Sequence, residues 1–335
     1  MKFIETILKS LFGEPEPKVE KASAVAVEVE TKAEAKDQDD LVDTAPLPIG
    51  AVRTVEGDLR WGEYSAGSAQ VTGRQRKENE DALLVLTTSE IGEDSMPEFG
   101  LFCVADGAGG HGHGELASAL ALRTVARYLL QEQFLYQLSS SDRNDAQSAK
   151  ELMHRAFERA DLNVSGGANG GLTTLTAALL HGDQLTIGHV GDTRAYLING
   201  EKIQLATRDH SVPWRLVEIG QLTPDEAREH PQRSLLWNAV GKGENLYVDV
   251  FTYPVPTGGY LLLCSDGLWS EILDNELQQI IQNTKDPYVA CETMVQQAND
   301  AGGSDNITAI LVSFSPDFGK GRYLQSDPYF PSPTD

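Results

Sequence analysis

The sequence predicts an α+β protein with antiparallel sheets, on three observations. Segments patterned like strands come in runs, and so do segments patterned like helices, whereas a wound parallel sheet needs the two to alternate. The stretch "LING" contains Asn199-Gly200, a dipeptide typical of the tight turn of a hairpin. At 335 residues, the chain is long enough to bury a substantial core in one large domain or two small ones.

The individual elements are expected after Trp61, where the composition changes from polar to patterned. Apolar runs and alternating patterns bounded by turn residues predict strands at 82–87, 99–105, 174–180, 184–190, 194–198, 247–253, 260–264 and 306–312. Longer segments with helical periodicity predict helices at 114–133, 146–163, 212–219, 224–229, 275–282 and 287–299.

The two ends of the chain are expected to lie outside the folded part. Residues 1–12 form a short amphipathic segment, which is either a frayed terminus or a helix that docks on a membrane surface or a partner. Residues 13–58 lack a sustained period and are too polar to bury a core, so they are expected to be a disordered acidic linker. Residues 315–335 are rich in Pro and Ser, which predicts a loose tail.

Composition excludes several classes of function. A formal net charge of −23 argues against nucleic-acid binding, which depends on Lys and Arg that neutralise phosphates. No stretch approaches the roughly 20 apolar residues that span a bilayer. Cys103 and Cys264 lie in apolar runs and are expected to be buried thiols, which indicates a reducing, cytoplasmic compartment.

The stretch "VADGAGGHGHGELAS" contains a Gly-rich pattern with two interpretations. Gly107, Gly109 and Gly112 match the G-x-G-x-x-G of dinucleotide-binding proteins. That interpretation needs an acidic residue about 20 positions later that opens a second parallel strand. Glu132 has this offset but lies at a predicted helix end before a polar segment, so the context fails. The alternative is that Asp106, just before the glycines, is the functional residue.

Several acidic residues share the position of Asp106 at the end of a predicted strand. Asp192 and Asp266 also end apolar strands, while Asp305 and the pair Glu80-Asp81 begin strands. One such residue is ordinary turn chemistry, but five strand-end carboxylate positions in one domain would repel each other without a bound cation. Oxygen ligands suit Mg²⁺ or Mn²⁺, and no Cys/His spacing suggests structural zinc.

These motifs carry a family resemblance. The chain over 59–314 resembles a metal-dependent protein phosphatase, the PPM or type 2C Ser/Thr class in its bacterial form. The resemblance implies a four-layer α-β-β-α sandwich of two mostly antiparallel sheets flanked by helices, with two metal sites at one end of the sheets. The matching blocks are "GRQRKENEDALL", "VADGAGGHGHGELAS", "GLTTLTAALL", "IGHVGDTRAYLI", "LATRDHS", "LTPDEAREHPQRSLL", "LLLCSDGLW" and "GGSDNITAILV".

The resemblance also implies roles for individual residues. Two tight sites for Mn²⁺ or Mg²⁺ are implied, together with a third, weaker site at Asp192. Glu80 matches a neighbouring acid placed through water, and Arg76 matches the arginine that grips the substrate phosphate, with Arg74 as the alternative on the same strand face. The implied ligands of the two tight sites are the side chains of Asp81, Asp106, Asp266 and Asp305 and the carbonyl of Gly107.

The implied activity is hydrolysis of phosphoserine and phosphothreonine on proteins by a water that the two cations activate. Ala108 stands where eukaryotic members carry a His proposed to protonate the leaving oxygen, and His111 and His113 lie nearby, so the general acid stays open. The alternatives are a pseudophosphatase acting as a regulatory binding module and a phosphatase of a specialised regulator or small phosphoester. The implied setting is a monomer in a Ser/Thr kinase pathway, cytoplasmic or peripheral to the membrane.

Overall fold

The computed structural model describes residues 63–88, 97–109, 112–136, 148–243 and 245–319. Every described residue belongs to one compact unit, Asp58–Asp335. The predicted amphipathic segment 1–12, the predicted linker 13–58 and residues 320–335 of the predicted tail lie outside the described residues. No helix in the described part is both long and apolar enough to cross a bilayer.

The first sheet is antiparallel and has five strands in the order β1-β11-β10-β7-β8. Its central strands β10 and β11 are almost wholly buried and apolar, which makes them the framework of this half of the molecule. The strands in this order are β1 (Tyr64–Val71), β11 (Ile307–Phe314), β10 (Tyr260–Cys264), β7 (Arg194–Asn199) and β8 (Lys202–Leu205).

The second sheet is also antiparallel and follows the order β2-β3-β5-β6-β9, with a short sixth strand paired to β3. Apart from residues at one end of each strand, β3 and β5 are buried throughout, as expected of strands covered on both faces. Its members are β2 (Asp81–Thr87), β3 (Phe99–Ala108), β5 (Leu175–His181), β6 (Gln184–Val190), β9 (Asp249–Pro254) and the short β4 (Leu172–Thr173).

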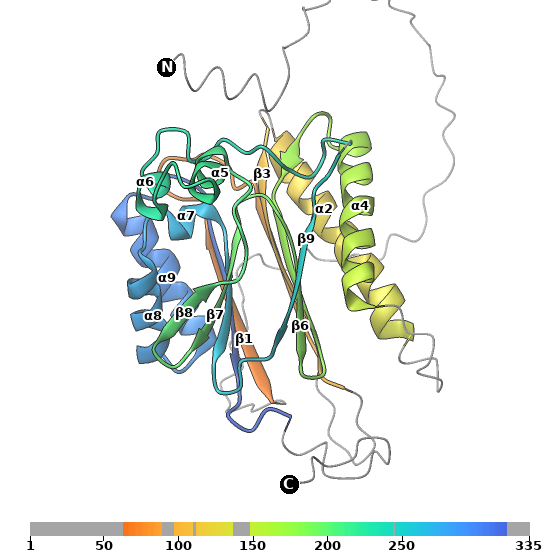
Figure 1. Cartoon of the computed structure of the whole chain (residues 1–335), viewed down its shortest axis with the longest axis vertical. Coiled ribbons are helices and arrows are strands. Elements are labelled where there is room, and N and C mark those ends of the chain that lie inside the picture. Colours follow the sequence, from red (N-terminus) through yellow and green to blue (C-terminus); the bar gives the residue numbers. More distant parts are fainter. Residues whose placement is uncertain (1–62, 89–96, 110–111, 137–147, 244, 320–335) are drawn as a thin grey trace, which may run out of the picture. The chain divides into compact units, whose positions relative to one another are not determined.

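Helices cover the outer faces of the two sheets and complete four layers, as Figure 1 shows. α2 (His113–Leu129), which continues into the π-helical turn η1 (Leu130–Leu135), packs with α4 (Ala149–Gly167) over the second sheet. α8 (Asp274–Asn283) and α9 (Pro287–Ala301) cover the first sheet. A third apolar cluster lies between the sheets. The α-β-β-α sandwich implied by the resemblance is confirmed.

Strand β1 was absent from the predicted elements for a physical reason. Its sequence "YSAGSAQV" is rich in small and polar residues, which have low strand propensity. It forms because it pairs with β11 along its whole length and lies under α9. A Cβ on Gly67 would come within 2.2 Å of the Tyr288 backbone nitrogen, so only glycine permits this approach of the helix.

A hairpin turn, the end of the folded part and one short helix also differ from the prediction. The hairpin pairs Asn199 with Lys202, so the turn consists of Gly200 and Glu201 and Asn199 is the last strand residue. The folded part does not stop at 314, because Phe318 is buried against Phe314 and Ser315 donates its N–H to the Glu63 carbonyl. The start of the predicted loose tail is therefore packed. A short helix, α7 (Asp266–Trp269), was also not predicted.

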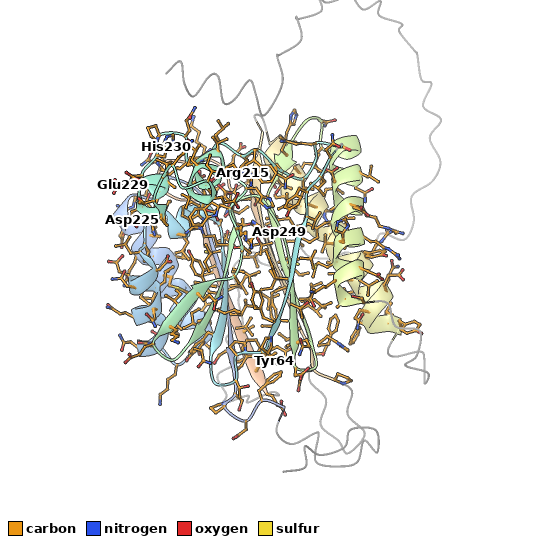
Figure 2. The ribbon with its side chains drawn as sticks, viewed as in Figure 1. Tyr64, Arg215, Asp225, Glu229, His230 and Asp249 are labelled. Carbon is orange, nitrogen blue, oxygen red and sulfur yellow. The ribbon has the colours of Figure 1, made fainter. Side chains whose placement is uncertain are left out.

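The flap, defined as residues 210–245, lies beside α7 and contains α5 (Val212–Glu218) and α6 (Pro224–Arg228). Figure 2 shows Arg215, Asp225, Glu229 and His230 of the flap at the end of the sandwich opposite Tyr64. Its ends are held by backbone hydrogen bonds from His210 N–H to the Gly191 carbonyl and between Val240 and Thr173. Near its middle, the guanidinium of Arg228 donates to the carbonyls of Trp269 and Ile272.

Candidate active site and metal centre

Aspartates from both sheets meet at the flap end of the sandwich. Asp81 begins β2 and lies opposite Asp106 of β3 in the register of the second sheet. Asp266 follows β10 as the first residue of α7, and Asp305 precedes β11. A cavity of about 730 Å³ opens over them, and its lining includes Asp106, Asp192, Asp266 and Asp305. The topology therefore brings together residues that are far apart in the sequence.

The carboxylates of this cluster disfavour one another's charge. Burial, followed by repulsion from neighbouring aspartates, raises the pKa of Asp81 to about 7. The pKa of Asp266 is raised to about 6 by burial and by the charge of Asp305. Burial and the same set of acids raise the pKa of Asp106 well above its usual value. Without a cation, burial and mutual repulsion therefore favour the protonated form of these carboxylates.

The oxygen atoms of the cluster fit a divalent cation. Asp81 Oδ1 and Asp266 Oδ1 are buried and have no hydrogen-bond partner, although buried polar atoms are normally paired. The other oxygen of Asp81 accepts a hydrogen bond of 2.6 Å from Thr308 Oγ1, which fixes the orientation of the carboxylate. Within the described ranges, no three acidic, His or Cys side chains form a finished ligand set around one point. Hard cations with oxygen ligands and waters suit such a donor set.

Arg76 lies at the rim of the cavity beside the carboxylates. Its Nη2 donates to Asp305 Oδ2 at 2.6 Å, and its side chain lines the cavity. Arg74 instead pairs with Asp300, and its exposed side chain does not line the cavity. Of the two arginines that the sequence left open, Arg76 is therefore the one that lines the cavity beside the aspartates.

The loop that carries Arg76 and Glu80 is fixed by Asn306, a residue that the sequence reasoning missed. Asn306 Nδ2 donates to the carbonyls of Thr72 and Glu78, and its Oδ1 accepts from the Glu80 N–H. Its place directly after Asp305 in "GGSDNITAILV" could have indicated this role, because an Asn side chain can both donate to and accept from backbone groups.

The backbone around Gly107 is too closely packed for any side chain. A Cβ there would lie 2.2 Å from the Gly114 carbonyl oxygen and 2.6 Å from the Glu80 carbonyl oxygen. A Cβ on Gly114 would in turn meet Glu80 Oε1 at 2.6 Å. Gly107 lines the cavity, and the absence of a side chain at Gly107 and Gly114 lets β3, the start of α2 and the Glu80 segment pack together at this edge. Close backbone packing is therefore the reason for glycine at these two positions.

Asp192 is buried next to the cluster, and its position depends on Trp269 of α7. Trp269 Nε1 donates to the Asp192 carbonyl at 3.0 Å, and the Arg194 guanidinium stacks 3.7 Å from the centre of the Trp269 ring. Arg194 is itself held by Asp209 through hydrogen bonds of 2.7 and 3.0 Å. Burial and the charge of Asp266 raise the pKa of Asp192 well above its usual value.

The candidate proton donors are not all near the cavity. Ala108 lines the cavity, where a general acid would be needed, but its side chain has no ionisable group. His113 begins α2 and lies outside the cavity lining. His111 lies outside the described residues. Other cavity residues that the sequence did not indicate include Lys242 and Ser234 at the flap and Thr173 and Thr174 near β5.

Comparison with known proteins gives the same class as the fold and the site. The protein phosphatase 2C family model matches residues 77–311. The serine/threonine phosphatase stp of Listeria monocytogenes is 33% identical over 244 residues, 72% of this chain and 92% of the relative. The structure of the Mycobacterium tuberculosis serine/threonine phosphatase PstP/Ppp is similar with a TM-score of 0.63 and 27% identity, over 75% of this chain and 99% of that one.

A further similar structure is that of the catalytic domain of the serine/threonine protein phosphatase PstP in complex with two manganese ions. It has a TM-score of 0.61 and 25% identity, and the match covers 75% of this chain and 98% of that one. The sandwich and its acidic end thus define a metal-dependent serine/threonine phosphoprotein phosphatase. The chain belongs to the protein phosphatase 2C family, in its bacterial form.

Proposed function

We propose that this chain hydrolyses phosphoserine and phosphothreonine on proteins at the cavity over its aspartate cluster. Asp81, Asp106, Asp266 and Asp305 are the proposed ligands of two divalent cations, together with the carbonyl of Gly107. The observation that carries the proposal is the pair of buried, unpartnered carboxylate oxygens on Asp81 and Asp266. When bound, two such cations supply an activated water and neutralise charge on the transferring phosphate.

The residues of the chain bind and orient the substrate. The guanidinium of Arg76 offers paired N–H donors to two phosphate oxygens, and its ion pair with Asp305 holds it over the acids. The Thr308 hydroxyl orients Asp81, and the side-chain amide of Asn306 holds the Arg76 loop through hydrogen bonds to backbone groups. Glu80 is proposed to act on a cation through water, since its side chain lies against Gly114 at the edge of the cavity.

Metal reconstitution is the direct test of this function. The protein is stripped with a chelator, dialysed, and assayed on a phosphothreonine peptide and an aryl phosphate with added Mn²⁺ or Mg²⁺. We expect activity on both substrates only with an added cation, and we propose that either ion supports it. Turnover that persists in excess chelator would contradict the proposed site.

Removal of Arg76 should weaken phosphate binding more than it slows chemistry. Arg76→Ala removes charge-assisted hydrogen bonds that are present in both the ground and transition states, so KM should rise by about tenfold or more and kcat should fall less. Arg74→Ala is the matched control, since Arg74 is exposed and pairs with Asp300. If Arg74→Ala raises KM and Arg76→Ala does not, the roles of the two arginines are reversed.

A third, weaker cation at Asp192 is a further part of the proposal. Ala108 has no proton to give to the leaving oxygen, so another source is needed near Asp192 and Asp266. Asp192→Ala should leave the two tight metals bound in calorimetry. It should lower kcat more for phosphoserine than for an aryl phosphate, whose leaving group needs less protonation. Equal losses on the two substrates, or loss of a tight metal, would reject this role.

The physiological setting is proposed on narrower grounds. Phosphoprotein substrates follow from the family, and we propose that they come from a Ser/Thr kinase pathway, with the enzyme acting as a cytoplasmic monomer without nucleic acid. Residues 1–12 are proposed to dock on a membrane surface or a partner. Fractionation of the full chain against one lacking residues 1–58 tests the docking. A pseudophosphatase is the weaker alternative, because no acidic position of the family pattern is missing.

A further inference from the structure

A second cavity lies away from the aspartate cluster, between α2 and α4. It has a volume of about 520 Å³, which is in the range of sites that hold small ligands or short peptide segments. Arg123 and Arg127 lie one helical turn apart on α2, and Arg159 faces them from α4. The apolar part of the lining comes from Leu120, Tyr128 and Leu162. We refer to this cavity as the arginine groove.

In the described part of the chain, no acidic side chain pairs with the three arginines. No Asp or Glu lines the groove, and none of the three forms an ion pair with an acid among the residues that the structure describes. Glu158, the sequence neighbour of Arg159, pairs instead with His154. The whole chain has a net charge of −23, so a cavity with three unpaired arginines differs in sign from the protein as a whole. The charge is therefore available to a ligand.

Contacts within the groove hold the arginine stems in place. The Arg159 guanidinium lies 4.5 Å from the centre of the buried Tyr128 ring. Arg123 Nε donates to the Ala119 carbonyl at 3.1 Å, which leaves its terminal nitrogens for other partners. Asn163 Nδ2 donates to Thr124 Oγ1 at 3.1 Å, so the two helices that form the walls are tied together. A planar guanidinium held in this way is suited to bidentate contact with carboxylates.

We propose that the arginine groove binds an acidic segment of the phosphoprotein substrate, with Asp or Glu side chains on the arginines and an apolar side chain against Leu120 and Leu162. The proposal rests on the function proposed above. Gly112, which lines the active-site cavity, immediately precedes α2. With a helical rise of about 1.5 Å per residue, Arg123 and Arg127 lie roughly 15 to 21 Å along the helix. About five to seven residues of extended peptide span that distance.

The test compares two phosphothreonine peptides that differ only in their acidic segment. One carries four Glu residues beginning six positions from the phosphothreonine, on either side in separate peptides, and the other carries Gln at the same positions. Exposed charge-assisted hydrogen bonds are individually weak, so we expect about a tenfold higher kcat/KM for the Glu peptide in one of the two placements. In Arg123→Gln/Arg127→Gln/Arg159→Gln this preference should fall below about twofold, with aryl phosphate kinetics unchanged.

A matched variant separates the groove from net charge. Lys150→Gln/Lys202→Gln/Lys285→Gln removes three exposed positive charges outside the groove and should keep the preference. The proposal fails if the wild-type protein shows no preference, or if both triple variants lose it equally. It also fails if the arginine variant loses only binding to phosphatidylserine vesicles, which would make the groove a membrane contact. Absence of hydrolysis of every substrate by the wild-type protein would instead contradict the proposed function.

Discussion

Asp266→Asn is expected to reduce hydrolysis of both peptide and aryl phosphates by about a thousandfold or more. A metal centre contributes several kcal/mol to transition-state stabilisation, and each 1.36 kcal/mol is a factor of ten. The amide keeps the size of the side chain but offers only a neutral oxygen to a cation. Calorimetric titration with Mn²⁺ should show loss of at least one tight site. Unchanged turnover with two tight sites retained would contradict the assignment of Asp266.

The same variant should still fold, and its stability without metal gives an independent readout. The folded-state pKa of Asp266 is raised to about 6, above its usual value, so the folded state holds this proton more tightly than the unfolded state does. The proton on Asp266 therefore stabilises the folded protein fully below the pKa that Asp266 has in the unfolded chain. This contribution is lost as the pH rises through the pKa that Asp266 has in the folded protein. In chelator, the unfolding temperature of the wild-type protein should fall between about pH 4 and 7, and Asp266→Asn should weaken this fall. Asp300→Asn, at an exposed pair with Arg74, is the control that should change neither readout.

Arg194→Ala should cause the largest loss of folding stability among single changes near the site. Arg194 and Asp209 are both almost wholly buried and are joined by a bidentate ion pair, with Tyr196 OH accepting a further bond of 3.0 Å from the guanidinium. Removing one partner leaves the other charge buried and unpaired, which costs about 3 to 5 kcal/mol. For a domain of this size, that corresponds to a fall of about 10 °C in the unfolding temperature.

Two comparisons identify the cause of that loss. Arg215→Ala removes an exposed guanidinium paired with Glu218 and should change the unfolding temperature little. Arg194→Met combined with Asp209→Leu removes both buried charges and should recover most of the stability, because the penalty comes from the unpaired carboxylate. If the double variant is no more stable than Arg194→Ala, the packing of Arg194 on Trp269 matters more than the ion pair.

The sequence predicted the strands that are continuous apolar runs, and it missed those formed by pairing. β3, β5 and β10 were predicted within a few residues because a strand buried on both faces must be apolar throughout. β1 forms at a sheet edge from mostly small and polar residues, so the local pattern carried little signal for it, whereas β8 alternates polar and apolar residues but is only four residues long. The burial of Phe318 could not be predicted either, because Phe318 joins the apolar cluster between the sheets, whose other members come from all along the chain.

The acidic part of the candidate site could be predicted because its aspartates lie at the ends of strands, and these ends meet in the fold. Repulsion between acids at strand ends indicated a cation before any distance was known, and the structure places Asp106, Asp192, Asp266 and Asp305 at one cavity. The sequence could not separate the positions of Arg76 and Arg74, because they differ through their pairing with Asp305 and Asp300. The arginine groove was equally hidden, since its arginines come from two helices that are not adjacent in the chain, α2 and α4.

Several of the contacts that join the flap to the sandwich are hydrogen bonds in which at least one partner is a main-chain atom. Gly191 and Thr173 offer backbone groups to its ends, the N–H groups of Gly241 and Gly243 donate to Asp161, and Arg228 binds two carbonyls after α7. Such joints do not depend on which side chains the rest of the flap exposes. The exposed side chains of α5 and α6 can therefore be exchanged, or this part of the flap grafted from another chain, without disturbing the aspartate cluster, provided that Arg228 and the backbone contacts at the flap ends are kept.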